Sequence, residues 1–229
     1  MKNIRGVTFD AGGTLVRPFP SVGHIYSEVM AQHGLECDGE MLEAAFRRAW
    51  KNAQGIKRAG LSDESEKEWW KNLVRETLNG LDKPPDFDSL FEDLWSTFAD
   101  SKRWKLYEGV TEVLPALKKR GYKIAVLSNW DKRLRSILNG LDIARYFDHI
   151  VISSEVGYEK PDPRIFKFTE EKLKMSGSEI LHVGDSHYHD AEPARKAGWK
   201  WIVVHHHPEL LAATESSVFS LAEVLEMLS

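Results

Sequence analysis

The sequence predicts an α/β protein in which a parallel sheet is covered by helices on both faces and one helical segment is inserted. Three observations support this fold class. Short apolar runs alternate with segments of helical periodicity, one long stretch has no strand pattern, and polar residues follow the apolar runs where they end. Strands that alternate with helices favour parallel pairing in a sheet that is buried on both faces.

Five apolar runs have the length and composition of buried strands. The first ends in an aspartate followed by a pair of glycines, which is typical of a strand that leads into a tight loop. The runs cover residues 4–9, 123–127, 149–153, 180–183 and 199–204.

Helical patterns fall between most of these runs, at residues 110–120, 132–141, 163–173 and 190–197. Gly121 and Gly198 follow the first and the last of them, at positions typical of helix C-termini. Ser220 is followed three residues later by Glu223, a capping-box pair that predicts one more helix near the C-terminus.

Residues 18–105 show helical patterns and no strand pattern. Ile25 and Val29 share one helix face, and five of the eight tryptophans fall in this stretch, which favours the core of a helical bundle. We therefore predict a core domain of residues 1–17 and 106–229, with a helical domain of residues 18–105 inserted after the first strand.

Composition excludes several classes of function. The chain has 229 residues, of which 42% are hydrophobic, and its net charge of -4 gives no basic excess for a nucleic-acid backbone. It has no apolar run of the roughly 18 residues that a membrane span needs, and its N-terminus does not resemble a signal peptide. Cys37 is the single cysteine, so we expect no intramolecular disulfide and a cytoplasmic location. The oligomeric state is left open.

Polar side chains at the ends of the predicted strands form a candidate site. Asp10 ends the first strand, Ser128 the second and Asp185 the fourth, while Lys160 lies in the loop after the third. Ligands collect at the carboxyl ends of parallel strands. In that position Asp10 can act as a nucleophile that forms an acyl phosphate. Ser128 can donate a hydrogen bond to phosphate and Lys160 can neutralise its charge.

The loop after Asp10 is suited to anions and to a metal ion. It contains two glycines, so the backbone N–H groups around Ala11 and Gly12 can approach a phosphate closely. Asp10 and Asp185, with Asp190 behind them, form an oxygen-rich pocket of the kind that Mg²⁺ favours. The metal would let an anionic nucleophile meet an anionic substrate.

Four motifs in chain order carry a resemblance to a known family. They are Phe9-Asp10-Ala11-Gly12-Gly13-Thr14-Leu15, Leu127-Ser128-Asn129, Lys160-Pro161-Asp162-Pro163, and Gly184-Asp185-Ser186 with Asp190. Through them the chain resembles the haloacid dehalogenase (HAD) superfamily of hydrolases over essentially its whole length. Residues 128–131 and 160–166 are most similar to the subgroup of HAD-like hydrolase domain-containing protein 3. The resemblance implies a Rossmann-like core and an inserted cap of the four-helix type.

The resemblance also implies a reaction and its residues. In this superfamily the aspartate of the first motif attacks phosphorus, which gives Asp10 the role of nucleophile. Ser128 and Lys160 then hold the transferring phosphoryl group, with Asn129 beside them at the phosphate. The implied substrate is a small phosphorylated metabolite.

The implied cofactor is Mg²⁺. The resemblance places it on the carboxylates of Asp10 and Asp185 and on the backbone carbonyl of Gly12. Asp190 would hold a metal-bound water or orient Lys160.

Gly12 departs from the phosphatase pattern. Phosphatases of the superfamily carry a second aspartate at this position, which protonates the leaving alcohol and then activates water. Glycine can do neither, and a general acid–base group contributes about 10²–10⁴ in rate. The leading interpretation is a Mg²⁺-dependent phosphohydrolase, of weak activity, with a substitute acid–base or with substrates that leave easily. His187 or His189 could be that substitute, because histidine titrates near neutrality.

Three other interpretations stay open. A 2-haloacid dehalogenase needs neither a proton for halide nor Mg²⁺, but such relatives typically lack the aspartate present here as Asp185. A phosphonate hydrolase needs a cap lysine, for which Lys51 is the candidate, although its surroundings do not match. A non-catalytic domain could bind a phosphorylated ligand or a protein partner. Trp130 either lines the pocket or packs below the cap.

Overall fold

The computed structural model describes residues 1, 3–53, 60–81, 84–206 and 217–228. The chain divides into two compact units: Met1–Arg17 with Leu106–Ser229, here named the core unit, and Pro18–Lys105, here named the inserted unit. No helix in the described ranges is both long enough and apolar enough to cross a membrane.

The core unit is built on a six-stranded sheet in the order β5-β4-β1-β6-β7-β8, and every neighbouring pair of strands is parallel. The strands are β1 (Gly6–Phe9), β4 (Lys123–Ser128), β5 (His149–Ile152), β6 (Ile180–Gly184), β7 (Lys200–Val204) and β8 (Ser217–Val218). Phe9 of β1 pairs with Val126 of β4 on one side and with Val183 of β6 on the other. Strand order therefore reverses at β1, which is where open α/β sheets bind ligands.

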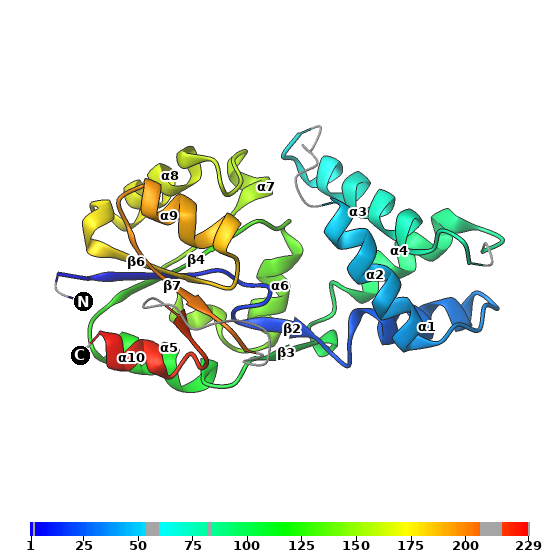
Figure 1. Ribbon diagram of the computed structural model, residues 1–229, viewed down its shortest axis with the longest axis horizontal. Helices are drawn as coiled ribbons and strands as arrows, with labels where there is room; N and C mark the ends of the chain where they lie inside the picture. Colours follow the sequence, from blue (N-terminus) through cyan, green and yellow to red (C-terminus); the bar gives the residue numbers. More distant parts are fainter. Residues whose placement is uncertain (2, 54–59, 82–83, 207–216, 229) are drawn as a thin grey trace. The chain divides into compact units, whose positions relative to one another are not determined.

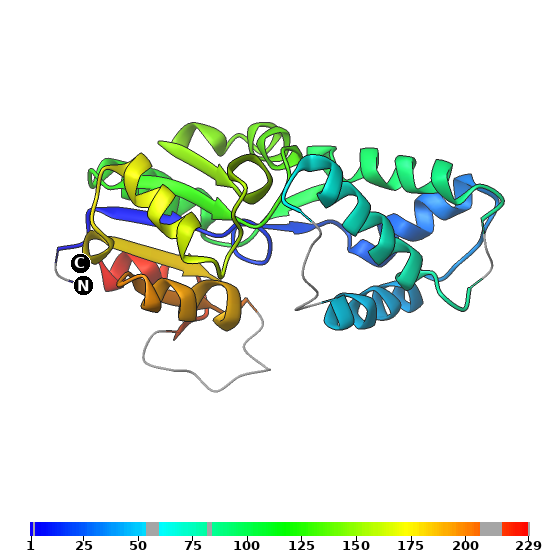
Figure 2. The same ribbon diagram turned by 90° about the horizontal axis from the view of Figure 1, so that it is seen from above.

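Helices cover both faces of this sheet. α5 (Val110–Lys119) and α10 (Glu223–Met227) lie on one face, and α8 (Pro163–Leu173) and α9 (Glu192–Lys196) lie on the other (Figures 1 and 2). α6 (Arg133–Gly140) follows β4, and the short α7 (Ser153–Val156) follows β5. β1 and β6 are buried along their whole length, which explains why their sequences are mostly apolar with no alternating pattern. The predicted α/β class with a parallel sheet is confirmed.

The inserted unit is helical throughout its described interior. Its helices are α1 (Val22–Gln32), α2 (Gly39–Ala53), α3 (Asp63–Thr77) and α4 (Phe87–Thr97). Side chains of Ser21, Ser62 and Asp86 cap the first, third and fourth of these by accepting backbone N–H groups. Their apolar faces meet in a core of Tyr26, Val29, Met30, Leu42, Val74, Leu78, Leu90, Phe91 and Leu94.

Two features differ from the sequence prediction. β2 (Val16–Pro18) and β3 (Trp104–Leu106) pair as a two-stranded sheet at the two ends of the inserted unit; strands of three residues are too short to show a period. The helix predicted over 190–197 is instead a π-helical turn, His187–Ala191, followed by α9. Ser186 caps the turn, and Pro193, which has no N–H to donate, interrupts the regular helical hydrogen bonding.

Candidate active site

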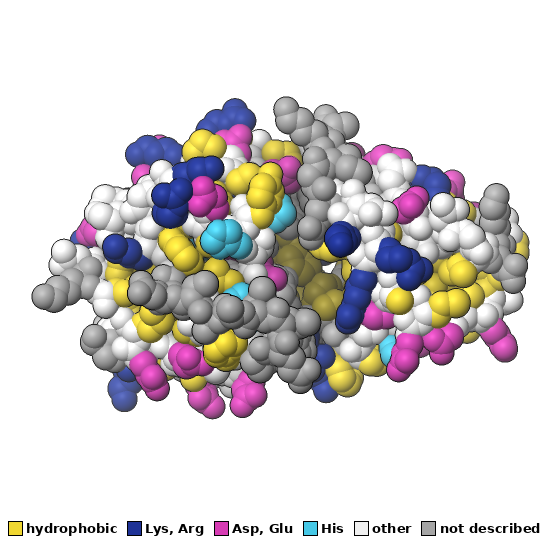
Figure 3. Space-filling view, in the orientation of Figure 1, with side chains coloured by type: hydrophobic (Ala, Val, Ile, Leu, Met, Phe, Trp, Pro, Cys, Tyr) yellow, Lys and Arg dark blue, Asp and Glu magenta, His cyan; other side chains and the backbone are white. Residues whose placement is uncertain are grey.

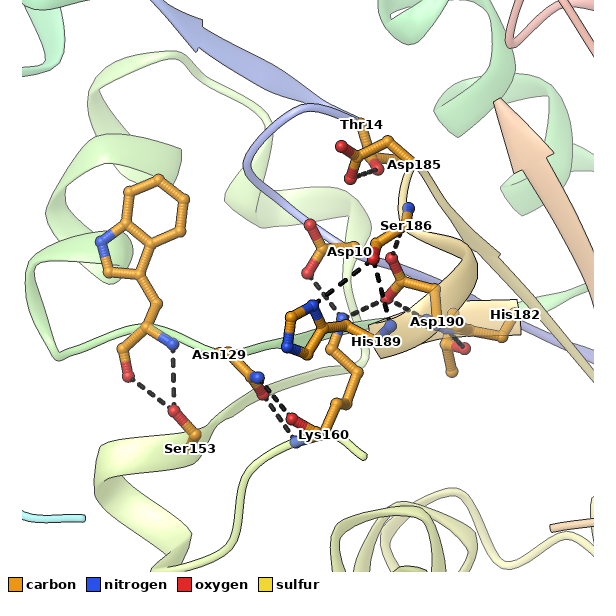
Figure 4. Close-up of polar contacts among 12 residues, drawn as sticks. Asp10, Thr14, Asn129, Ser153, Lys160, His182, Asp185, Ser186, His189 and Asp190 are labelled. Carbon is orange, nitrogen blue, oxygen red and sulfur yellow. Dashed lines mark hydrogen bonds and ion pairs between the residues drawn. The ribbon is translucent and has the colours of Figure 1, made fainter. Parts of the chain in front are cut away.

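Lys160 bridges two aspartates at the carboxyl ends of the central strands. Its Nζ lies 2.7 Å from Oδ1 of Asp10 and 2.5 Å from Oδ1 of Asp190 (Figure 4). The side chains of Lys160 and Asp190 are each 2% exposed, whereas that of Asp10 is 12% exposed. Of these three residues, Asp10 is therefore the one that a substrate can reach, which is what an attacking group requires.

Asn129 fixes the loop that carries Lys160. Its Oδ1 accepts the backbone N–H of Lys160 and its Nδ2 donates to the backbone carbonyl of Lys160, both at 2.7 Å. The buried Ser128 at the end of β4 is the residue before it. The Asn129 side chain, expected at the phosphate, is thus used to hold Lys160, and a phosphate contact of Asn129 has to come from its main chain.

Both carboxylate oxygens of Asp190 bond to protein donors. Oδ1 lies 3.0 Å from Nε2 of His182 in addition to its contact with Lys160, and Oδ2 accepts the backbone N–H of Ser186 at 3.0 Å. Of the two roles expected for Asp190, this arrangement supports the orientation of Lys160. The single bond to Oδ2 leaves a lone pair of that oxygen for the metal-bound water that was also expected at Asp190.

His182 joins Asp190 to the neighbouring strand. It is fully buried in β6, and burial lowers its pKa, although the hydrogen bond to Asp190 opposes that effect. A carboxylate only accepts, so Nε2 carries the proton and Nδ1 accepts from the hydroxyl of Thr8 at 2.8 Å. Neither Thr8 nor His182 was predicted from the sequence to belong to the site. The available signal was a polar residue inside each of two apolar runs, and the sheet pairs Thr8 with His182 in register.

Asp185 lies at the end of β6, where its side chain is open to solvent. The hydroxyl of Thr14 donates to its Oδ1 at 3.3 Å. Gly13 beside it has φ of 81°, and a Cβ there would lie 2.5 Å from Oδ2 of Asp185. Both the backbone conformation and the close carboxylate therefore require glycine at this position.

Three carboxylates face one ammonium in this site. Burial, countered in part by Lys160, raises the pKa of Asp10. Burial also acts on Asp190, but Lys160 and His182 outweigh it and hold its pKa below the ordinary value. Desolvation of its carboxylate by the surrounding protein raises the pKa of Asp185, and repulsion from Asp10 and Asp190 raises it further, to about 7.

The donor set fits Mg²⁺. The described part of the chain contains no group of three or more His, Cys, Asp or Glu side chains arranged to hold a metal ion. Mg²⁺, however, is usually bound through one or two carboxylates and keeps several waters. Asp10, Asp185 and the carbonyl of Gly12 can supply such a set, and the raised pKa of Asp185 shows negative charge that a cation would neutralise.

Gly12 lies against the indole of Trp130. A Cβ on Gly12 would be 3.1 Å from Cζ3 of the ring. The main chain of Trp130 is held by one hydroxyl, because Ser153 Oγ accepts its N–H at 3.0 Å and donates to its carbonyl at 3.1 Å. The Trp130 ring therefore lies beside the loop that follows Asp10.

The two histidines of the π-helical turn, His187 and His189, contact residues of the turn and of β7. The ring edge of His187 packs on Trp201 with centroids 6.1 Å apart. The backbone N–H of His189 donates to Ser186 Oγ at 3.1 Å, and its Nδ1 lies 3.4 Å from the same oxygen. Figure 3 shows histidine side chains reaching the surface of the core unit on this face. Lys51 is exposed in the last turn of α2.

A second pair of rings supports the loop after Asp10, and one of them follows β7. His206 stacks on Tyr107 with centroids 3.6 Å apart and planes 4° apart, and its Nε2 donates to the carbonyl of Thr14 at 3.0 Å. The backbone N–H of Tyr107 donates to the carbonyl of Leu15. No sequence pattern links these residues, because they lie on three separate segments.

Comparison with known proteins identifies the family of this chain. The family model for haloacid dehalogenase-like hydrolases matches residues 4–198, so the chain belongs to this family of hydrolases. Haloacid dehalogenase-like hydrolase domain-containing protein 3 of Bos taurus is 33% identical over 219 residues, covering 94% of this chain and 87% of that protein. The expected superfamily and subgroup are confirmed.

Solved structures with the same fold include both dehalogenases and phosphatases. L-2-haloacid dehalogenase from Xanthobacter autotrophicus superposes with a TM-score of 0.77 at 18% identity, with 98% of each chain covered. A HAD hydrolase from Bacillus subtilis bound to magnesium gives 0.74 at 16% identity, with 99% of each covered. A HAD phosphatase from Thermococcus onnurineus gives 0.66 at 20% identity, covering 99% of this chain and 98% of that one. At these identities the likeness shows the fold alone.

Proposed function

We propose that this chain is a Mg²⁺-dependent phosphohydrolase that acts on small phosphorylated metabolites through an aspartyl-phosphate on Asp10. The observation that carries the proposal is the buried Lys160, which holds the one accessible carboxylate of the trio, Asp10, and is itself held by Asp190. Asp185 supplies a further carboxylate that is open to solvent. A nucleophile, a fixed cation and a place for a mobile cation are the parts that phosphoryl transfer needs.

The reaction follows in two steps from these residues. The carboxylate of Asp10 forms a bond to phosphorus while the bond from phosphorus to the leaving oxygen breaks. Lys160 and Ser128 hold the phosphoryl oxygens as negative charge shifts among them. Water then attacks phosphorus, and the acyl-phosphate bond breaks with its electron pair returning to Asp10. One proton of the water stays on the phosphate and the other goes to the phosphate or to solvent. When bound, Mg²⁺ would supply the neutralisation that lets two anions meet.

Asp185 favours phosphoryl transfer over dehalogenation. A 2-haloacid dehalogenase attacks carbon and has no use for a cation next to its nucleophile. Desolvation, together with repulsion from the carboxylates of Asp10 and Asp190, raises the pKa of Asp185 to about 7, and a bound cation would relieve that repulsion. Lys51, the candidate for a phosphonate hydrolase, is exposed on α2, which is consistent with an ordinary surface lysine.

The inserted unit would select the substrate. We propose that it is the four-helix cap of this family, because it enters the chain directly after β1 and the nucleophile loop. We also propose a cytoplasmic location without nucleic-acid or membrane partners, in line with the net charge of -4 and the single Cys37.

The test is hydrolysis of p-nitrophenyl phosphate with and without Mg²⁺ by the full chain, Asp10→Asn and Asp142→Asn. Asp142 is an exposed aspartate of the core unit, so its variant should match the wild type, while Asp10→Asn should lose Mg²⁺-dependent turnover. Release of chloride from 2-chloropropionate without Mg²⁺ would assign a dehalogenase instead. Folded protein that acts on neither compound would overturn the proposal.

A further inference from the structure

Trp130, rather than the backbone, closes the position of the missing second aspartate. Gly12 is not among the glycines with positive φ, so its backbone conformation would accept a side chain. A Cβ at Gly12 would nevertheless meet three atoms of the six-membered ring of Trp130, at 3.1, 3.7 and 3.9 Å. The shortest of these distances is tighter than an ordinary van der Waals contact, so the indole would have to give way by a few tenths of an ångström to admit a side chain at position 12.

The indole is carried on a fixed main chain. Ser153, fully buried at the start of α7, bonds to both the N–H and the carbonyl of Trp130, and the N–H of Ser154 donates to the same carbonyl at 3.2 Å. Asn129, the residue before it, is bonded twice to the backbone of Lys160. The backbone can therefore not carry the ring away from Gly12 without breaking bonds that hold the catalytic loops.

We propose that Trp130 is a specificity-determining residue that excludes a general acid from position 12 and so restricts this enzyme to phosphate esters of acidic hydroxyls, the aryl and enol phosphates. This inference rests on the proposed function and names its substrate class. The indole would also present an aromatic surface beside the nucleophile loop, on which a planar leaving group can stack.

The chemistry of the first step gives the reason for this class. When Asp10 attacks phosphorus, the leaving oxygen takes the electron pair of the broken P–O bond and departs as an anion, because no group at position 12 gives it a proton. An aryl or enol oxygen delocalises that charge over its π system, whereas an alkoxide cannot. A proton donor typically contributes about 10²–10⁴ in rate, so its absence should separate the two kinds of ester by a factor of that order.

The experiment compares p-nitrophenyl, phenyl and propyl phosphate with Mg²⁺ in the wild type, Gly12→Asp, Trp130→Ala, Trp130→Phe and Gly12→Asp/Trp130→Ala. We expect wild-type kcat/KM to fall at each step of the series, by about 10² or more to propyl phosphate. Gly12→Asp alone should gain nothing on propyl phosphate. The double variant should gain about tenfold or more over Trp130→Ala, and Trp130→Phe, which keeps a ring, should resemble the wild type.

Two outcomes of this comparison overturn the inference. One is equal turnover of propyl and p-nitrophenyl phosphate by the wild type, which would mean that another group supplies the proton. The other is a gain in Gly12→Asp as large as in the double variant, which would mean that Trp130 does not exclude the aspartate.

A stability measurement separates failure of the inference from failure of the proposed function. Thermal unfolding of the same variants needs no activity, and Gly12→Asp should lower the melting temperature more in the wild type than in Trp130→Ala. If no variant acts on any ester, the proposed function fails, while an unequal cost of Gly12→Asp still supports exclusion by Trp130. An equal cost in both backgrounds overturns it.

Discussion

Replacing Lys160 by methionine should destabilise the core unit strongly, because it leaves two buried carboxylates without their shared cation. Nζ of Lys160 bonds to Asp10 and to Asp190, and its side chain is 2% exposed. Burial lowers the pKa of Lys160, but the two carboxylates outweigh burial and raise it, so the ammonium is charged in the folded chain. Removing one partner of such a buried set costs roughly 3–5 kcal/mol, or a fall in melting temperature of roughly 6–20 °C.

The loss should depend on pH with a defined sign. Without the ammonium, the folded-state pKa values of Asp10 and Asp190 rise above those of the unfolded chain. Carboxyl groups of this kind stabilise the fold below the unfolded pKa, and that contribution is lost as pH rises through the folded value. The deficit of Lys160→Met should therefore be larger at about pH 8 than at about pH 5.

The assay is thermal unfolding of both proteins across this pH range. Lys167→Met is the matched control on α8, because Lys167 is 69% exposed and pairs only at the surface with Glu170. Its change should stay within about 0.5 kcal/mol. A Lys160→Met chain as stable as the control, or a deficit that does not change with pH, would refute the assignment of Lys160 as the buried counter-ion.

Three further predictions concern the same cluster. The folded-state pKa of Asp185 is raised to about 7, so the stability that its protonated carboxyl contributes is lost as pH rises through that value. The Mg²⁺-free chain should therefore melt at a lower temperature at about pH 8 than at about pH 6, and Asp185→Asn should flatten this dependence in scanning calorimetry. His182→Phe removes one of the three donors to Asp190 and leaves the other two, Lys160 and the backbone N–H of Ser186, in place. It should lower the free energy of unfolding by roughly 1–3 kcal/mol in a urea titration, whereas an unchanged midpoint would contradict the hydrogen bond. Gly184→Ala puts a Cβ 2.2 Å from Cγ of Asp190 and should abolish turnover. Gly60→Ala should not, because among the described residues its Cβ would meet Ser65 first, at 3.5 Å. Full activity of Gly184→Ala would show that the position of Asp190 is not required.

The main site residues could be predicted because they depend on the sheet. β1, β4 and β6 are adjacent and parallel, so residues at or just after their carboxyl ends, such as Asp10, Ser128 and Asp185, meet at one edge. The order of strands and helices in the sequence is enough to imply this.

The supporting contacts could not be predicted because they join segments that share no local pattern. The position of Asp190 depends on a π-helical turn that forms only where Ser186 and the end of β6 hold it. The contact between Gly12 and Trp130 joins two loops that are distant in sequence. The absence of a side chain at Gly12 was visible in the sequence, but the ring that fills its place was not.

The central place of β1 has a consequence for the order of folding. Gly6 of β1 pairs with Lys123 and with Ile180, so both partners of the first strand come from far along the chain. The inserted unit lies entirely between β1 and its first partner and has an apolar core of its own. Contacts between distant segments cost more loop entropy and form slowly. During synthesis this helical unit can therefore form through local contacts before β4 has been made and has paired with β1. The strand that ends at Asp10 would then be among the last to reach its native place, and newly made chains would acquire a helical domain before they acquire any activity.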